Sequence, residues 1–341
     1  MIMFNKKKNV NKSEIDEEKR KRRKIMLMIL FVLFLISSLG LTTYAWFSSN
    51  KRTTIEGIDI RVATIDGMQI SADAINWGND LTRDQIINAY KTYPRAENQL
   101  PDVFNTVSTV GNVTDGKMDM FWGITTDEKD GVFTLTTTRE KEIQCTGDEE
   151  CGSKVYTAFD VFLLVNRPAV IALSSNSNVM PRNENYTKGA QYAARVGFVN
   201  EGTVSTDANP ASAQALRGGS RAYIWEPNYD KHTEDGVRAA KSIYGLDTTR
   251  TGAARLQYRG VNNEFQTPIS IDQTDKSSYF SLVNPAIATV EGFAEDQVFL
   301  NIPSGITKLR IYLWLEGQDV DMTDAIAADS LTFNIEFRMV N

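Results

Sequence analysis

The sequence predicts an all-β protein with mainly antiparallel strands, packed as a sandwich or barrel and preceded by an N-terminal hydrophobic helix. Apolar residues recur at every second position in many short runs, and turns rich in Gly, Asn, Asp and Ser separate these runs. The helical candidates are short and lie at 81–91, 235–244 and 321–328. An α/β fold is therefore disfavoured.

The N-terminal segment has the charge order of an export signal. An unbroken cationic block, Lys19 to Lys24, precedes the run Ile25 to Ile36, in which no side chain is polar. This order keeps the basic end in the cytoplasm and sends the following chain outward. The uncharged stretch continues to Phe47, which is long enough for a helix to cross a membrane.

Two fates remain open for this segment. Thr43 and Ala45 place small side chains at the positions that a signal peptidase inspects, so cleavage between Ala45 and Trp46 is favoured. A retained transmembrane helix is the alternative. In both cases the sequence predicts a cytoplasmic basic segment at 1–24, a signal peptide or transmembrane helix at 25–45, and an extracellular domain at 46–341.

The charge balance changes after this segment. Residues 1–24 carry 10 basic and 4 acidic side chains, which leaves 27 basic against 39 acidic side chains of the 37 and 43 in the whole chain. The exported part is therefore acidic, with a net charge of −12. Because such a surface repels phosphates, we expect no nucleic-acid partner.

The first predicted strand lies near the start of the exported part, where Ile58, Ile60 and Val62 alternate with polar residues. The run Val155 to Val165 is apolar on both faces except at Asp160, as expected of a central strand. Further strand candidates are 133–138, 170–173, 195–199 and 222–225.

Two long alternating runs close the chain. The first has Leu309, Ile311, Leu313 and Leu315 on one face and an amphipathic second face, formed by Lys308, Arg310, Tyr312 and Trp314. In the second, apolar residues from Leu331 to Phe337 alternate with polar ones. We expect these two strands to close a sheet. The more polar stretch 201–273 is expected to be an elaborated insertion of loops and short helices, with a separate small domain as the alternative.

The two cysteines, Cys145 and Cys151, lie in a turn-rich stretch between two strand-like runs. Outside the cell they are expected to form a disulfide at a hairpin tip, worth about 2 kcal/mol by loop closure. Two free thiols are the alternative. Two thiols without a nearby histidine make at best half of a metal site.

Catalytic motifs are not recognised in the sequence. The single histidine, His232, excludes a zinc site built on several imidazoles, and its polar neighbours indicate a surface loop residue. Neither a serine-hydrolase elbow nor a phosphate-binding glycine loop is recognised. The sequence therefore nominates no catalytic residue, and an enzyme is not expected.

One acidic stretch follows the strand that ends at Glu316. Asp319, Asp321 and Thr323 alternate as oxygen donors and are candidate calcium ligands, although the spacing is not that of an EF-hand. The favoured alternative is that Asp321 caps a helix that begins there.

Several stretches resemble exported surface proteins of Gram-positive bacteria, and most of all the group of TasA biofilm fibre proteins and camelysins. These stretches are TTYAWFSSN after the apolar run, YTAFDVFLLVN, RAYIWEPNYDKHT and the closing LRIYLWLEGQDVDMTDAIAADSLTFNIEF. The resemblance implies a jelly-roll-like β-sandwich with loop and short-helix insertions, processing by a signal peptidase, and a structural role at the cell surface or in a biofilm matrix.

The resemblance also implies a mode of assembly, in which the first strand leaves its own subunit and adds to the next. The matching segment here contains Ile58, Ile60 and Val62, whose side chains would fill pockets while the main chain pairs with an open sheet edge. Alternatively, these residues form the first strand of their own sandwich.

A different function is a membrane-anchored binding or adhesion module. Loops near Trp225, Tyr229 and Trp314 would then hold a glycan or a protein, since aromatic rings beside polar groups suit sugar stacking.

Overall fold

The computed structural model describes residues 53–63, 67–127, 133–140, 155–182, 188–238, 258–270, 279–290, 295–322, 326 and 329–340, together with Lys24, Met26 and Met28. The chain divides into two compact units, Met1–Tyr44 and Ala45–Asn341. In the first unit the three described residues are helical. The fold described below is that of the second unit.

Several sequence predictions fall outside these ranges. They concern the cleavage site at Ala45 and Trp46, the cysteines Cys145 and Cys151, and all of the export segment 25–45 except Met26 and Met28. Where the structure describes the chain, it contains no helix that is both long and apolar enough to span a bilayer.

The second unit is built mainly of β-strands, as predicted. In the described chain, one sheet has seven strands in the order β19–β11–β21–β1–β3, with β12 also paired to β21 and β4 to β1. Their bounds are β1 Thr53–Val62, β3 Asp80–Thr82, β4 Val103–Phe104, β11 Ala169–Leu173, β12 Asn178–Pro181, β19 Gln297–Ile302 and β21 Ser330–Val340.

The other large sheet has ten strands among the described residues, in the order β16–β9–β8–β5–β20–β13–β14–β18, with β10 paired to β20 and β2 to β10. Their bounds are β2 Gln69–Ser71, β5 Thr106–Ser108, β8 Phe121–Asp127, β9 Phe133–Arg139, β10 Thr157–Val165, β13 Ala194–Val204, β14 Ala222–Glu226, β16 Phe265–Ser270, β18 Ile287–Ala288 and β20 Gly305–Glu316. Two small ladders join β15 Arg259–Val261 to β17 Phe280–Leu282, and β6 Val113–Thr114 to β7 Lys117–Met118.

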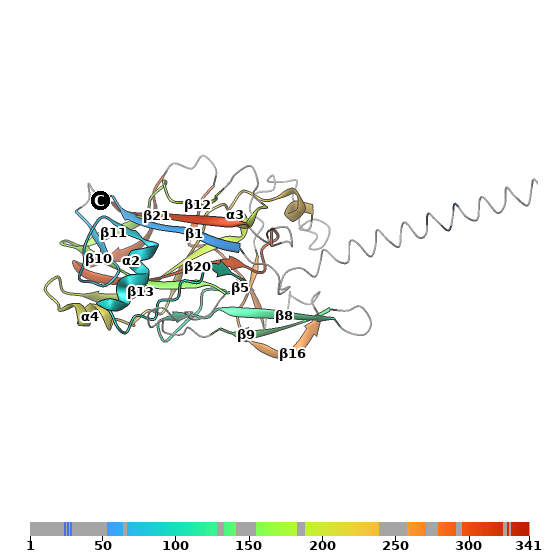
Figure 1. The fold of residues 1–341 in the computed structure, drawn as a ribbon, viewed down its shortest axis with the longest axis horizontal. Coiled ribbons are helices and arrows are strands. Elements are labelled where there is room, and N and C mark those ends of the chain that lie inside the picture. The colour runs from blue at the N-terminus through green and yellow to red at the C-terminus, as the bar shows by residue number, and fades with distance from the viewer. Residues whose placement is uncertain are drawn as a thin grey trace, which may run out of the picture. The chain divides into compact units, whose positions relative to one another are not determined.

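Most ladders are antiparallel, which confirms the prediction at this level. Over the residues that the structure describes, the parallel pairs are β1 with β21, β14 with β18, and β20 with β5. The first and the last strand of the described fold are therefore neighbours that run in the same direction, and they lie side by side in Figure 1.

The helices are short. They are α2 Arg83–Asn88, followed by the 3-10 turn η3 Ala89–Lys91, then α3 Ala190–Ala193, α4 Pro210–Gln214, and an unlabelled helix at 234–238. Local sequence explains where α2 starts, because Thr82 and Gln85 form a capping box in which each side chain accepts a hydrogen bond from the other residue's main-chain N–H. The helix predicted at 81–91 is thus confirmed from Arg83 to Lys91, with its last turn tightened, whereas Leu81 and Thr82 belong to β3.

The main core lies between the two large sheets. Alternate residues of β21, among them Phe333 and Phe337, are buried together with Ile58 and Ile60 of β1 and with Ile311 of β20. Each such side chain contributes about 1.5–3 kcal/mol on burial. The arrangement is a two-layer, sandwich-like packing in which β1 and β21 lie over β20 and β13 (Figure 1).

The prediction that β20 has one buried and one amphipathic face is wrong. Every residue of β20 is buried, because a second apolar cluster containing Tyr312 and Trp314 packs against that face and because Lys308 and Arg310 pair with Asp160. Alternation in a sequence shows which residues share a face, but not whether another segment covers that face.

The expected pairing of the last two strands is also wrong. β20 pairs with β10, β13 and β5, whereas β21 pairs with β1, β11 and β12 in the other sheet. Within the stretch 201–273, the strand predicted at 222–225 is β14, and β16 is a further strand of the same ten-stranded sheet, while 239–257 and 271–273 lie outside the described residues.

Candidate functional site

The candidate site is a buried polar cluster around the turn that follows β20. Gly317 N–H donates to the carbonyl of Val107 (2.7 Å), and Met322 N–H to the carbonyl of Asp319 (3.1 Å). These turns bring the acidic side chains inward, so that Glu316, Asp319 and Asp321 are at most 1% exposed. The acidic stretch, for which the sequence predicts calcium ligands or a helix cap, is therefore part of the interior.

Arg195, at the start of β13, is the cation of this cluster and is fully buried. One guanidinium nitrogen donates to Glu226 of β14 (2.7 Å) and to Asp319, and another donates to the carbonyls of Tyr192 and Ala194. Because β13 and β20 pair directly, the guanidinium lies beside the acidic turn.

His232 is the partner of Asp321. Its Nδ1 lies 2.6 Å from Asp321 Oδ2, and its ring is 1% exposed. The other carboxylate oxygen accepts hydrogen bonds from Thr233 N–H and Thr233 Oγ1, both at 2.7 Å. The prediction that His232 is a surface residue is wrong, because its local sequence is polar but its partner lies 89 residues further along the chain.

Thr233 connects Asp321 to the short helix at 234–238. Its hydroxyl accepts a hydrogen bond from Gly236 N–H (2.9 Å), as an N-cap does. A side chain at Gly236 would collide with Asp321 Oδ1, so glycine allows this close approach. Asp321 thus anchors the start of this helix, whereas of the predicted helix at 321–328 only part is described.

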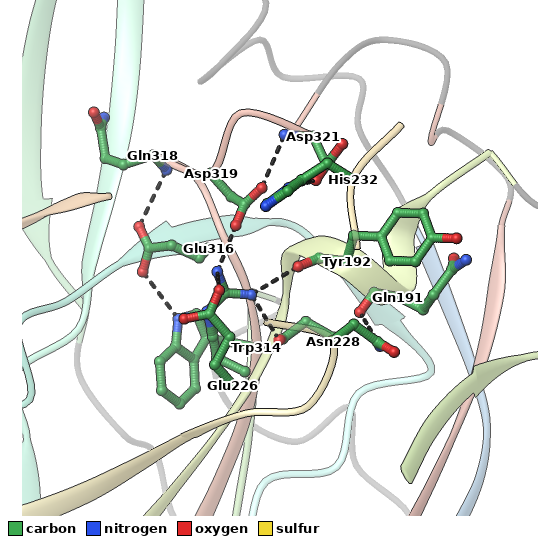
Figure 2. Close-up of polar contacts among 12 residues, drawn as sticks. Gln191, Tyr192, Glu226, Asn228, His232, Trp314, Glu316, Gln318, Asp319 and Asp321 are labelled. Carbon is green, nitrogen blue, oxygen red and sulfur yellow. Dashed lines mark hydrogen bonds and ion pairs between the residues drawn. The ribbon is translucent and has the colours of Figure 1, made fainter. Parts of the chain in front are cut away.

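Three potential metal ligands meet at this point. His232, Asp319 and Asp321 each offer one ligand atom, and these atoms all lie within 4.8 Å of one another. Asp321 N–H also donates to Asp319 Oδ1 at 2.8 Å, as Figure 2 shows. Of the predicted ligands, the structure brings Asp319 and Asp321 together, and Thr323 lies outside the described residues. Sequence reasoning missed His232, whose only signal was its being the single histidine.

Carboxylates outnumber cations in the cluster. Glu226, Glu316, Asp319 and Asp321 lie around one guanidinium, that of Arg195, which pairs with Glu226 and Asp319, so carboxyl groups outnumber fixed cations. Burying unpaired charge is costly, and the carboxyl groups respond by holding protons more tightly.

The acid–base properties of the carboxyl groups follow mainly from their burial. Burial raises the pKa of Glu226 to about 7, although the Arg195 charge opposes it, and burial likewise raises the pKa of Glu316 to about 7. Burial also raises the pKa of Asp319 against the pull of Arg195. Burial alone would lower the pKa of His232, but its hydrogen bond to Asp321 and the nearby Asp319 charge raise it.

A second buried ionic group behaves differently. Asp160 of β10 accepts from Arg310 (2.7 Å) and from Tyr93 (2.8 Å), and Lys308 Nζ lies 3.1 Å away. Although burial acts to raise the pKa of Asp160, the two cations lower it to about 2. Because two cations face one carboxylate, this group needs no additional cation and serves the packing of β20 against β10.

The residues nominated for strand donation lie in the chain's own core. Ile58, Ile60 and Val62 are 1%, 0% and 3% exposed, within β1 and beside β21. The proposed sugar-stacking tryptophans are buried as well. Trp225 and Trp314 are fully buried and donate to Thr289 Oγ1 and Glu316 Oε2, so neither ring offers a face for stacking.

Comparison with known protein families, curated proteins and solved structures finds no match for this chain. The resemblance to the TasA and camelysin group therefore rests on its sequence features alone. The function has to be argued from the position of β1 and from the buried cluster.

Proposed function

We propose that this chain is an exported structural protein of a Gram-positive cell surface, a biofilm-matrix or fibre-type subunit whose copies assemble by exchanging β1. The fold proposed for the subunit is a jelly-roll-like sandwich. The observation that carries the proposal is the position of β1, the first strand of the described fold, inside a sheet and parallel to the last strand.

The pairing of β1 is suited to exchange. On one side it pairs with β21 from Thr54 and Ser330 to Val62 and Phe337, with one register shift between Ile55 and Gly57. On its other side β3 and β4 pair only with its two ends, at Asp59–Arg61 and Thr53–Thr54. If β1 leaves, it uncovers the edge of β21 and an apolar groove that it alone had filled.

An identical strand from a second copy refills that groove with the same contacts. Since the sequence of the donor is the same, exchange conserves main-chain hydrogen bonds and buried side chains, and concentration decides between closed monomers and chains of subunits. Cleavage between Ala45 and Trp46 would leave only residues 46–52 before β1, so that β1 would no longer be tied to a membrane segment.

Deletion of residues 46–62 tests the proposal. We expect the shortened chain to remain monomeric at concentrations at which the full exported chain forms oligomers, measured by light scattering. A synthetic peptide of residues 53–62 should bind the shortened chain and raise its thermal stability, because it restores the missing strand. Assembly that survives the deletion would rule out exchange of β1.

The second candidate is a membrane-anchored module that binds a glycan or a protein. Of the aromatic residues nominated for it, Tyr229 is partly exposed. The mature N-terminus separates the two candidates. Intact mass and N-terminal sequencing should find Trp46 first for a released subunit, and an uncleaved chain in the membrane fraction for the module.

A further inference from the structure

We infer that the cluster of His232, Asp319 and Asp321 binds one divalent transition-metal cation, with His232 Nε2 and a carboxylate oxygen of Asp319 as ligands and Asp321 orienting the imidazole. The inference is independent of the proposed strand exchange. It follows from the state of His232, the charge of the cluster and the donor types present.

His232 has the geometry of a metal-ligating histidine. With Nδ1 bound to Asp321 Oδ2, the carboxylate fixes the ring orientation and favours the tautomer in which Nε2 carries the lone pair. Nε2 is buried and has no hydrogen-bond partner among the described residues. Figure 2 shows the ring reaching from Asp321 toward the carboxylate of Asp319. A buried nitrogen acceptor facing a carboxylate is chemically suited to a cation.

The charge of the cluster also favours binding of a cation. Four carboxylates face a single arginine within the described cluster, and the residues in contact with them supply no further fixed cation. A divalent cation would offset negative charge that the single arginine leaves unbalanced. Asp160, with two cations beside it, shows that this chain balances a buried carboxylate elsewhere with side chains alone.

The donor types favour a transition metal over calcium. Calcium takes six to eight oxygen ligands, whereas an imidazole nitrogen with carboxylate oxygen is the donor set of Zn²⁺ and related ions. The sequence-based calcium assignment is therefore replaced by a mixed nitrogen–oxygen site.

The single histidine makes a direct test possible. Long-range ¹H–¹⁵N NMR spectra of the full chain, labelled on histidine and purified without a histidine tag in a mild detergent, report His232 alone. We expect one equivalent of Zn²⁺ to shift the Nε2 resonance, with reversal by EDTA, and an equal concentration of Ca²⁺ to leave it unchanged. Zn²⁺ should also raise the thermal unfolding midpoint, because it binds the folded state.

Variants support the spectroscopic test. Calorimetry should give one Zn²⁺ site, weakened at least about tenfold in Asp319→Asn and His232→Gln. The matched control is Asp102→Asn, which removes a carboxylate that is 80% exposed and pairs only with Arg83 among the described residues, and which should bind Zn²⁺ as the unaltered chain does. The NMR readout needs no substitution, so it decides the matter even if a variant fails to fold.

Three results would overturn the inference. The first is an Nε2 resonance that stays in place at excess Zn²⁺ and excess Co²⁺, even if ions bind elsewhere. The second is Zn²⁺ affinity unchanged in a folded His232→Gln variant. The third is a response to Ca²⁺ alone, which would return the site to oxygen-only ligands.

Discussion

Two buried ionic groups in the same unit differ in how their carboxylates are balanced. Asp160 lies between Arg310 and Lys308, so its charged form is favoured, and its pKa falls from the ordinary 3.8 to about 2. In the Arg195 cluster, burial raises the pKa of Glu226 to about 7 although the Arg195 charge opposes it, and carboxyl groups outnumber cations. The ratio of carboxyl groups to cations therefore separates a structural ion group from a candidate ligand site.

Asp160 provides a prediction about acid stability. Its folded pKa is lower than its ordinary value, so its stabilising contribution is complete above about pH 4 and is lost as the pH falls through about 2. Asp160→Asn leaves Arg310 and Lys308 buried without an anion and should cost about 3–5 kcal/mol at pH 7.

Urea unfolding at pH 7 and pH 3 measures this effect. Between pH 7 and pH 3, the free energy of unfolding of Asp160→Asn should fall by less than that of the unaltered chain, because the variant has no carboxylate to protonate at this position. Asp102→Asn, in an exposed pair with Arg83, should change the free energy of unfolding by less than about 1 kcal/mol. Equal stability of Asp160→Asn and the unaltered chain at pH 7 would show that the group is not the structural pair described.

Among the residues of the candidate site, the sequence predicts those that are close together along the chain and misses those that are far apart. Asp319 and Asp321 were found because they are close together in the sequence. His232 and Arg195 were not, since they reach the site only through the pairing of β13 with β20 and through a contact between residues 89 apart. Periodicity and local motifs carry no information about such contacts.

Single strands were predicted best where one face is polar. In β21, residues from Leu331 to Phe337 alternate between buried and half-buried positions, as the sequence indicates. In β20 the pattern is the same, yet both faces are buried, because Tyr312 and Trp314 pack under a second cluster. A strand covered on both sides by aromatic or paired charged residues resembles an amphipathic strand in its sequence.

The packing of β1 in its own subunit can be tested by substitutions within this strand. Ile60 is completely buried in the main core, whereas Arg61 next to it is exposed. In the purified monomer, Ile60→Ala should lower the free energy of unfolding by about 2–5 kcal/mol, because it leaves a cavity. Arg61→Ala, the control, should change it by about 0.5 kcal/mol or less. A loss below about 1 kcal/mol for Ile60→Ala would mean that β1 is not packed in its own monomer.

For the whole molecule, the sequence predicted the mainly antiparallel β class but not how the strands are distributed between the sheets. The order of strands depends on which edges meet, and the alternation in β1, β20 and β21 is compatible with either sheet. The parallel pairing of β1 with β21 closes the seven-stranded sheet between strands that are more than 250 residues apart in sequence. This long-range pairing is also what makes β1 exchangeable.

The most direct test of the account is a reversible covalent lock between β1 and β21. Asp59 and Asn334 are register partners on the outward, half-buried side of these strands, so Asp59→Cys with Asn334→Cys can join them after Cys145 and Cys151 are replaced by serine. The matched control is Asn178→Cys with Asn334→Cys, which joins β12 to β21 and leaves β1 free to move.

Size-exclusion chromatography and non-reducing gels give the result. If β1 is exchanged, the Asp59–Asn334 double-cysteine variant oxidised as a monomer should not assemble until it is reduced. The same variant oxidised after assembly should yield covalent oligomers. The control variant should assemble in both the oxidised and the reduced state. Assembly of the oxidised monomer, or only intramolecular bonds after assembly, would contradict strand exchange.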